Sequence, residues 1–292
     1  MIRGNELEEQ VYEPDHIQQV LTEIEHNFPT YFESFSKRPL DPLFKERIKN
    51  YEKEQKKYSE YLNPSALREF DYDPNAFKSH TRKNCPIIRR CLMSQDEVMK
   101  DYKMSFGMVT GRQLLDSVRL ISEFGMSYVV GFDDEAHEDA AHYNDLRLEI
   151  LNEPEYGTRG VIGYGVQSSL LFGLYARHFA HRSQNAVWSL YFLSGRKSFG
   201  LEDESEFLMV EPKRGRCEQN YFYPAELFGF YALQVFLLLK SSCSDLGISL
   251  RDRHRYTYLS TFCDHVAESN REIIETYTRS SQDVESKPWF WS

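Results

Sequence analysis

Residues 159–171 have the sequence Arg-Gly-Val-Ile-Gly-Tyr-Gly-Val-Gln-Ser-Ser-Leu-Leu, and this stretch carries the most local structural information in the chain. Its glycines Gly163 and Gly165 lie between the apolar pair 161–162 and a predicted helix over residues 166–179. Glycine tolerates backbone conformations and close approaches that other residues do not. The first turn of a helix has backbone N–H groups without intrahelical acceptors, and such groups bind anions. The stretch therefore predicts a tight turn at a helix start that is suited to hold a phosphate.

The order of residue types in this stretch is similar to that of a known DNA-binding motif. An apolar residue, a G-x-G turn and a pair of small residues follow one another at Ile162, Gly163, Gly165, Ser168 and Ser169. This order resembles the hairpin of helix-hairpin-helix DNA-binding proteins. The next residues, 176–186, are similar to the segment that follows the hairpin in DNA glycosylases of that superfamily. The resemblance extends over about residues 150–195.

The resemblance implies a DNA-binding protein with a role in DNA repair, modification or defence. In that family the hairpin amides hold backbone phosphates, and contacts of this kind position the protein without reading the base sequence. Residues 182–184, Arg-Ser-Gln, stand where the catalytic Asp of the glycosylases is expected, and the hairpin lacks their Lys, so glycosylase activity is not implied. The nucleic-acid-binding residues that follow from the resemblance are Gly163, Gly165, Gln167, Ser168, Arg177, Arg182 and Gln184.

Two other interpretations of the turn stay open. A dinucleotide-binding fold would place a third glycine or alanine where this chain has Ser168, and would alternate strands with helices. The segments after this turn are predicted to be helices, which disfavours that fold. In the other interpretation, the turn joins packed helices and its glycines serve close contact only.

Charge is unevenly distributed along this acidic chain, whose net charge is −10. Residues 35–112 contain 17 Lys and Arg against 11 Asp and Glu, whereas residues 1–34 and 113–160 are strongly acidic. A basic segment within an acidic protein is typical of a surface that contacts phosphate. The alternative is that the basic segment packs against its acidic neighbours.

An alternative enzymatic hypothesis comes from residues 202–213. An apolar run that ends in Glu211-Pro212-Lys213, with Asp203 upstream, resembles the PD-(D/E)-x-K nucleases. The resemblance implies that Asp203, Glu211 and Lys213 are catalytic, with the two carboxylates holding a divalent ion such as Mg²⁺ and the lysine assisting the attacking water. The short spacing and Pro212, which interrupts strand pairing, favour a charged surface turn instead.

Helical periodicity dominates the chain. The predicted fold is predominantly α with a minor β component, a helical core that contains a helix-hairpin-helix-like turn. The most apolar stretch, 227–239, is shorter than the roughly 20 residues that span a bilayer, which predicts a buried core helix. Strands are predicted at 127–132 and 206–210, an acidic helix at 133–151, and an irregular region at 71–93.

We expect two regions, a charged helical N-terminal region over 1–93 and a helical core domain over 94–292. The five cysteines include no C-x-x-C pair, which gives a zinc finger no support. Reduced thiols and an N-terminus without an apolar run predict a cytoplasmic protein without a membrane partner. A non-enzymatic domain that binds a protein partner through its aromatic residues is the third hypothesis.

Overall fold

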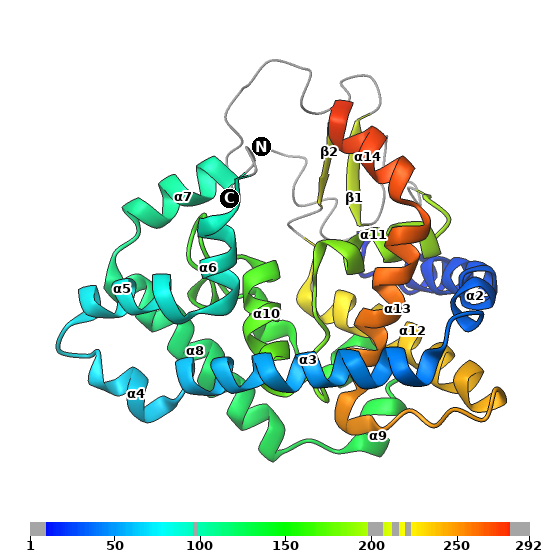
Figure 1. Ribbon diagram of the computed structural model, residues 1–292, viewed down its shortest axis with the longest axis horizontal. Helices are drawn as coiled ribbons and strands as arrows, with labels where there is room; N and C mark the ends of the chain where they lie inside the picture. The colour runs from blue at the N-terminus through cyan, green and yellow to red at the C-terminus, as the bar shows by residue number, and fades with distance from the viewer. Residues whose placement is uncertain (1–9, 96–98, 198–206, 212–215, 220–222, 281–292) are drawn as a thin grey trace.

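A computed structural model describes residues 10–95, 99–197, 207–211, 216–219 and 223–280. Helices make up most of this part of the chain (Figure 1), which confirms a predominantly α fold. The α-helices are α2 (Pro14–Ser36), α3 (Leu40–Tyr61), α4 (Pro64–Glu69), α5 (Pro74–Asn84), α6 (Pro86–Met93), α7 (Met99–Met108), α8 (Gly111–Val130), α9 (Asp134–Glu138), α10 (Tyr164–Tyr175), α11 (Gln184–Leu193), α12 (Ala225–Asp245), α13 (Arg255–Ser269) and α14 (Arg271–Ser280).

Shorter elements connect these helices. The 3₁₀ turns are η1 (Tyr143–Leu146), η2 (Glu149–Asn152), η3 (Pro154–Tyr156) and η5 (Asp252–His254). The described residues also form an antiparallel hairpin of β1 (Leu208–Glu211) and β2 (Arg216–Gln219), in which Leu208 is opposite Gln219.

The core is centred on α12, which is buried along most of its length. Within the described residues it is the one helix long and apolar enough to span a membrane by length and composition, and 61% of its most apolar window is buried inside the protein. It packs against α2 and α13, and α13 also packs against α11. The predicted core helix over 227–239 is thus the centre of a helix that extends further at both ends.

The two predicted regions, 1–93 and 94–292, share one hydrophobic core. Figure 1 shows α3 as a long helix that crosses α10 and α13, and the three helices are in contact. Phe44 of α3 meets Tyr258 of α13 edge-on, with the ring centroids 4.9 Å apart. Aromatic pairs of this geometry contribute about 0.5–1.5 kcal/mol beyond the area they bury. Aromatic side chains therefore join α3 firmly to the C-terminal helices.

The prediction of an irregular region at 71–93 is wrong, because this segment folds into α5 and α6. Each helix begins at a proline, Pro74 and Pro86. Proline is favourable in the first helical turn, where its missing N–H has no acceptor to lose. The Asp73 side chain also caps α5 by accepting a hydrogen bond of 3.0 Å from the amide of Ala76. The prolines thus start helices instead of breaking them.

Two predictions about residues 127–151 are also wrong. The predicted strand at 127–132 continues α8 instead, since a short apolar run does not distinguish a strand from a helix. The predicted acidic helix at 133–151 ends at Glu138 and is followed by 3₁₀ turns. Its His142 and Asp145 side chains hydrogen-bond to nearby backbone amides, and such local bonds compete with a continuous helix.

Candidate functional site

The turn singled out in the sequence lies at the start of α10. Gly163 caps the helix with an extended backbone, and Gly165 lies in its first turn; both residues are exposed. The left-handed conformation belongs instead to Gly160, whose φ is 71°, in the tight turn closed between Thr158 and Ile162. Within the described part of the chain, the amides of Gly165 and Val166 have no hydrogen-bond acceptor. The segment before this turn consists of 3₁₀ turns, and the preceding α-helix ends at Glu138.

Several polar side chains near this turn are used within the fold. Gln167 is buried and donates hydrogen bonds to the carbonyls of Leu151 and Tyr156. Ser168 accepts a hydrogen bond of 3.0 Å from the Arg182 amide. The Arg182 side chain is itself only 6% exposed, and it donates to the Tyr223 carbonyl at 2.8 Å. Gln167 thus joins α10 to η2 and η3, whereas Ser168 and Arg182 join α10 to the loop before α11 and to Tyr223.

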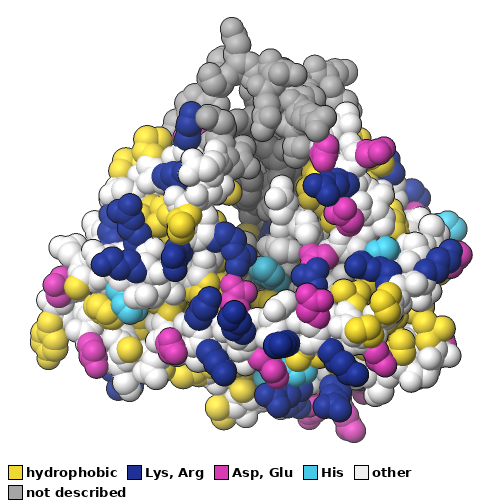
Figure 2. Space-filling view, in the orientation of Figure 1, with side chains coloured by type: hydrophobic (Ala, Val, Ile, Leu, Met, Phe, Trp, Pro, Cys, Tyr) yellow, Lys and Arg dark blue, Asp and Glu magenta, His cyan; other side chains and the backbone are white. Residues whose placement is uncertain are grey.

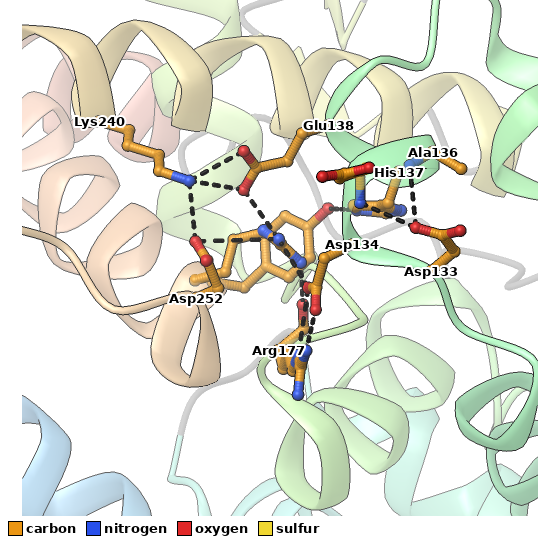
Figure 3. Close-up of polar contacts among 11 residues, drawn as sticks. Asp133, Asp134, Ala136, His137, Glu138, Arg177, Lys240 and Asp252 are labelled. Atoms are coloured by element: carbon orange, nitrogen blue, oxygen red, sulfur yellow. Dashed lines mark hydrogen bonds and ion pairs between the residues drawn. The ribbon is translucent and has the colours of Figure 1, made fainter.

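Arg177 belongs to a network of ion pairs that Figure 3 shows from α9 to α12. It pairs with Asp134, and the carbonyl of Arg177 accepts a hydrogen bond of 2.8 Å from Arg255. Arg255 is fully buried and pairs with Asp134 at 3.2 Å and with Glu138 at 2.9 Å. Lys240 completes the network through Glu138, at 2.8 Å, and Asp252, at 2.9 Å. Arg177, a predicted phosphate contact, thus takes part in an ion pair of the fold, and its side chain is 43% exposed.

The remaining predicted binding residue, Gln184, lies at a polar cleft of about 410 Å³ between α3, α6, α10, α11 and α13. This volume falls in the range of about 300–1,000 Å³ that is typical of small-molecule sites. The residues that line the cleft are Arg47, Asn50, Tyr51, Glu54, Gln55, Tyr58, Ile87, Arg90, Ser169, Phe172, Gly173, His181, Ser183, Gln184, Asn185, Thr257, Ser260, Thr261 and Asp264.

Helical spacing explains why these polar residues converge. The α3 residues recur every three or four positions from Arg47 to Tyr58, and the α13 residues do the same from Thr257 to Asp264. Such spacing places side chains on one helix face. At Gly173 of α10 a Cβ atom would lie 2.3 Å from the Tyr58 ring, so only glycine permits this approach of α10 to α3. The polar stripes of α3 and α13 were the sequence signal for this cleft.

The interior of the cleft combines aromatic rings with a neutral histidine. The His181 ring stacks on Phe172 with centroids 4.9 Å apart, and burial, reinforced by Arg90, lowers its pKa to about 4. Ser169 donates its hydroxyl proton to the Gly165 carbonyl, so His181 donates from Nε2 to Ser169 and keeps Nδ1 unprotonated. His181 is therefore a neutral hydrogen-bonding group at neutral pH.

Two residues that line the cleft, Arg47 and Arg90, belong to a larger set of exposed cations on α3, α5 and α6. We call the exposed Lys and Arg residues of α3, α5 and α6 the basic face; Figure 2 shows Lys and Arg side chains gathered over these helices. Its members are Lys45, Arg47, Lys49, Lys53, Lys56, Lys57, Arg82, Lys83, Arg89 and Arg90. No residue from this set was among the predicted binding residues, although the excess of basic residues in 35–112 pointed to the same helices.

The residues of the nuclease hypothesis fall mainly outside the described part of the chain. Asp203 and Lys213 lie outside it, and Glu211 is described only as a backbone position in β1. Among residues that the structure does describe, no group of three or more His, Cys, Asp or Glu side chains is arranged to hold a metal ion.

Comparisons with known protein families, with curated proteins and with solved structures find no match for this chain.

The neutral state of His181 predicts how stability depends on pH. The unfolded chain protonates this histidine near pH 6.5, whereas the folded protein does so only near pH 4, so stability is lost as the pH falls through this window. The loss from His181 is expected to reach about 2 kcal/mol between pH 7 and pH 5. Urea unfolding at the two pH values measures it.

The His181→Gln variant, which keeps a hydrogen-bonding side chain, should lose less stability over the same interval than the unsubstituted protein. The control is the exposed residue His26. The His26→Gln variant should lose as much stability between pH 7 and pH 5 as the unsubstituted protein. Equal pH dependence in the unsubstituted protein and in His181→Gln would contradict the prediction.

Proposed function

We propose that the protein binds nucleic acid, with the basic face contacting backbone phosphates. The observation that carries the proposal is the charge of α5 and α6, whose described residues include five Lys and Arg and no Asp or Glu. Arg82, Lys83 and Arg89 are exposed and have no ion-pair partner within the described residues. Exposed cations without an ion-pair partner suit a polyanion, because phosphate contacts supply most of the affinity in nucleic-acid binding.

The acidic residues that form ion pairs at the cleft and on α9 have partners other than Arg82, Lys83 and Arg89. Glu54 pairs with Arg90 at 2.8 Å and Asp264 pairs with Arg47 at 3.0 Å, both at the cleft. Asp134 and Glu138 of α9 pair with Arg177, Lys240 and Arg255. Of the cations on α5 and α6, Arg90 has an ion-pair partner among the described residues, and that partner, Glu54, belongs to the basic segment 35–112 and not to its acidic neighbours.

The helix-hairpin-helix-like turn enters this proposal as a second phosphate contact. The free amides of Gly165 and Val166 at an exposed helix start support it. A valine at Gly165 would have only the Arg182 carbonyl nearby, 3.7 Å from its Cβ, so Gly165→Val fits the fold while covering the amides. Reduced affinity of this variant in the titration described next would support a contact at the turn, and unchanged affinity would exclude it.

The test is fluorescence anisotropy with labelled 12-mers of single-stranded DNA and RNA and with a DNA duplex, titrated from 50 to 200 mM salt. Binding should weaken steeply with salt, since each phosphate contact releases counterions. The Arg82→Glu/Lys83→Glu/Arg89→Glu variant should bind more than tenfold more weakly at low salt. For this variant, the slope of the logarithm of the binding constant against the logarithm of the salt concentration should be shallower by about 2. Each of the three lost phosphate contacts to a single strand contributes about 0.7 to the slope.

A matched control reverses the same number of charges away from the basic face. Lys37 and Arg38 follow α2, Arg271 is the first residue of α14, and all three are exposed. Lys37→Glu/Arg38→Glu/Arg271→Glu changes the net charge equally, so it should reduce affinity only slightly. Absence of salt-dependent binding, or an equal effect of the two triple variants, would refute the proposed function.

A further inference from the structure

The cleft differs electrically from the basic face around it. Its two arginines are each paired with a carboxylate, Arg47 with Asp264 and Arg90 with Glu54, and its histidine is neutral. The lining charges thus cancel inside the cleft, while Arg82, Lys83 and Arg89 of the basic face have no ion-pair partner among the described residues. A phosphate gains little from a neutral site, whereas a flat uncharged ligand with hydrogen-bonding edges suits it.

Two hydroxyls of the cleft lining have hydrogen-bonding capacity that the fold does not use. Thr257 is only 5% exposed, and its hydroxyl has no partner among the residues described. The Tyr51 hydroxyl accepts hydrogen bonds from Gln55, at 2.9 Å, and from the Ala176 amide, at 3.1 Å. Burial raises the pKa of Tyr51 to about 12, so the hydroxyl keeps its proton, for which the described residues supply no acceptor. The Thr257 hydroxyl and the proton of Tyr51 are therefore groups with which a ligand in the cleft can form hydrogen bonds.

The mouth of the cleft offers two carboxamides. Asn50 of α3 and Gln184 of α11 line the cleft, are exposed, and make no side-chain hydrogen bond within the described chain. A carboxamide presents a donor and an acceptor side by side, the arrangement that pairs with base edges. Phe172, stacked on His181, adds an aromatic surface to the same lining. Aromatic stacking combined with edge recognition is the usual way in which proteins hold an unstacked base.

From these observations we infer that the cleft binds one unstacked nucleobase of a single-stranded nucleic acid, while the neighbouring cations hold its phosphates. The inference rests on the proposed function, because the base that enters the cleft belongs to a strand whose phosphates lie on the basic face. The ligand in the cleft is a neutral heterocycle. Its edge forms hydrogen bonds with Asn50, Gln184, Tyr51 and Thr257. The free strand is favoured over a duplex, since its bases are already unpaired.

The experiment compares single-stranded 12-mers of dA, dC and dT with a 12-mer of the same backbone in which every base is absent. The phosphates are identical, so the ratio of affinities reports the bases alone. At least one base-bearing strand should bind tenfold or more tightly than the base-free strand, as stacking and edge contacts to one base predict. The DNA duplex, whose bases are paired, should not bind tenfold more tightly than the base-free strand.

Asn50→Ala/Gln184→Ala should reduce that ratio at least threefold without changing the dependence on salt. Asn75→Ala/Gln18→Ala removes two exposed amides away from the cleft and should leave both quantities unchanged. Equal binding of base-bearing and base-free strands would overturn the inference and leave the proposed function standing. If none of the strands binds, the proposed function itself fails.

Discussion

Replacing Arg255 with alanine is expected to lower the free energy of unfolding by about 3–5 kcal/mol, the cost of breaking a buried ion pair from one side. The Arg255 side chain is completely buried and reaches Asp134, Glu138 and the carbonyl of Arg177. It also lies over the rings of Phe132 and Phe236, so its loss removes packing as well as charge. Urea unfolding followed by circular dichroism measures the change.

Two further variants separate the charge of Arg255 from its shape. Arg255→Lys keeps the positive charge but lacks the planar guanidinium group. Its free energy of unfolding should therefore fall by less than that of the alanine variant, but still measurably. The control is Arg271→Ala, because Arg271 pairs with Glu268 and Glu275 at the surface and should contribute less than about 1 kcal/mol. Arg255→Ala would contradict the prediction if it cost no more than Arg271→Ala.

The second large effect is expected at Gly111, where α8 meets the start of α5. A Cβ atom there would lie 1.9 Å from the carbonyl oxygen of Pro74, so alanine cannot enter unless the backbone of α5 moves. Overpacking of this kind costs about 1–3 kcal/mol, and we expect Gly111→Ala to be near the upper end. Because α5 carries Arg82 and Lys83, the same variant should also weaken nucleic-acid binding.

Gly107 of α7 provides a control of opposite sign. Its Cβ position has no atom within 4 Å, so Gly107→Ala should stabilise the helix by about 0.5–1 kcal/mol through helix propensity alone. The midpoint temperature of thermal unfolding should therefore fall for Gly111→Ala and rise for Gly107→Ala. Equal shifts would show that the contact between Gly111 and Pro74 is not a constraint.

Local patterns in the sequence predicted the central helix well, because its apolar run was clear. The apolar run at 227–239 lies in the buried helix α12. The same reasoning failed at residues 127–132, because a short apolar run fits a helix as well as a strand. It failed at Pro74 and Pro86 because proline is compatible with a helix start as well as with a break.

The candidate site was harder to predict than the fold. The binding residues named from the turn included Gln184, which lies at the cleft, whereas Gln167 and Arg182 are buried and hydrogen-bonded within the fold, and Arg177 pairs with Asp134. The sequence does not reveal which polar side chains already have partners, since Arg177 meets Asp134 across 43 positions of the chain.

The sequence by itself determined the helical class, the buried helix at the centre and the excess of cations in residues 35–112, since each depends on neighbouring residues or on simple composition. Only the tertiary structure decided which cations stay unpaired and that α3, α10 and α13 enclose a neutral polar cleft. The physical reason is that charge pairing and burial depend on contacts between segments distant in sequence, such as Arg47 with Asp264.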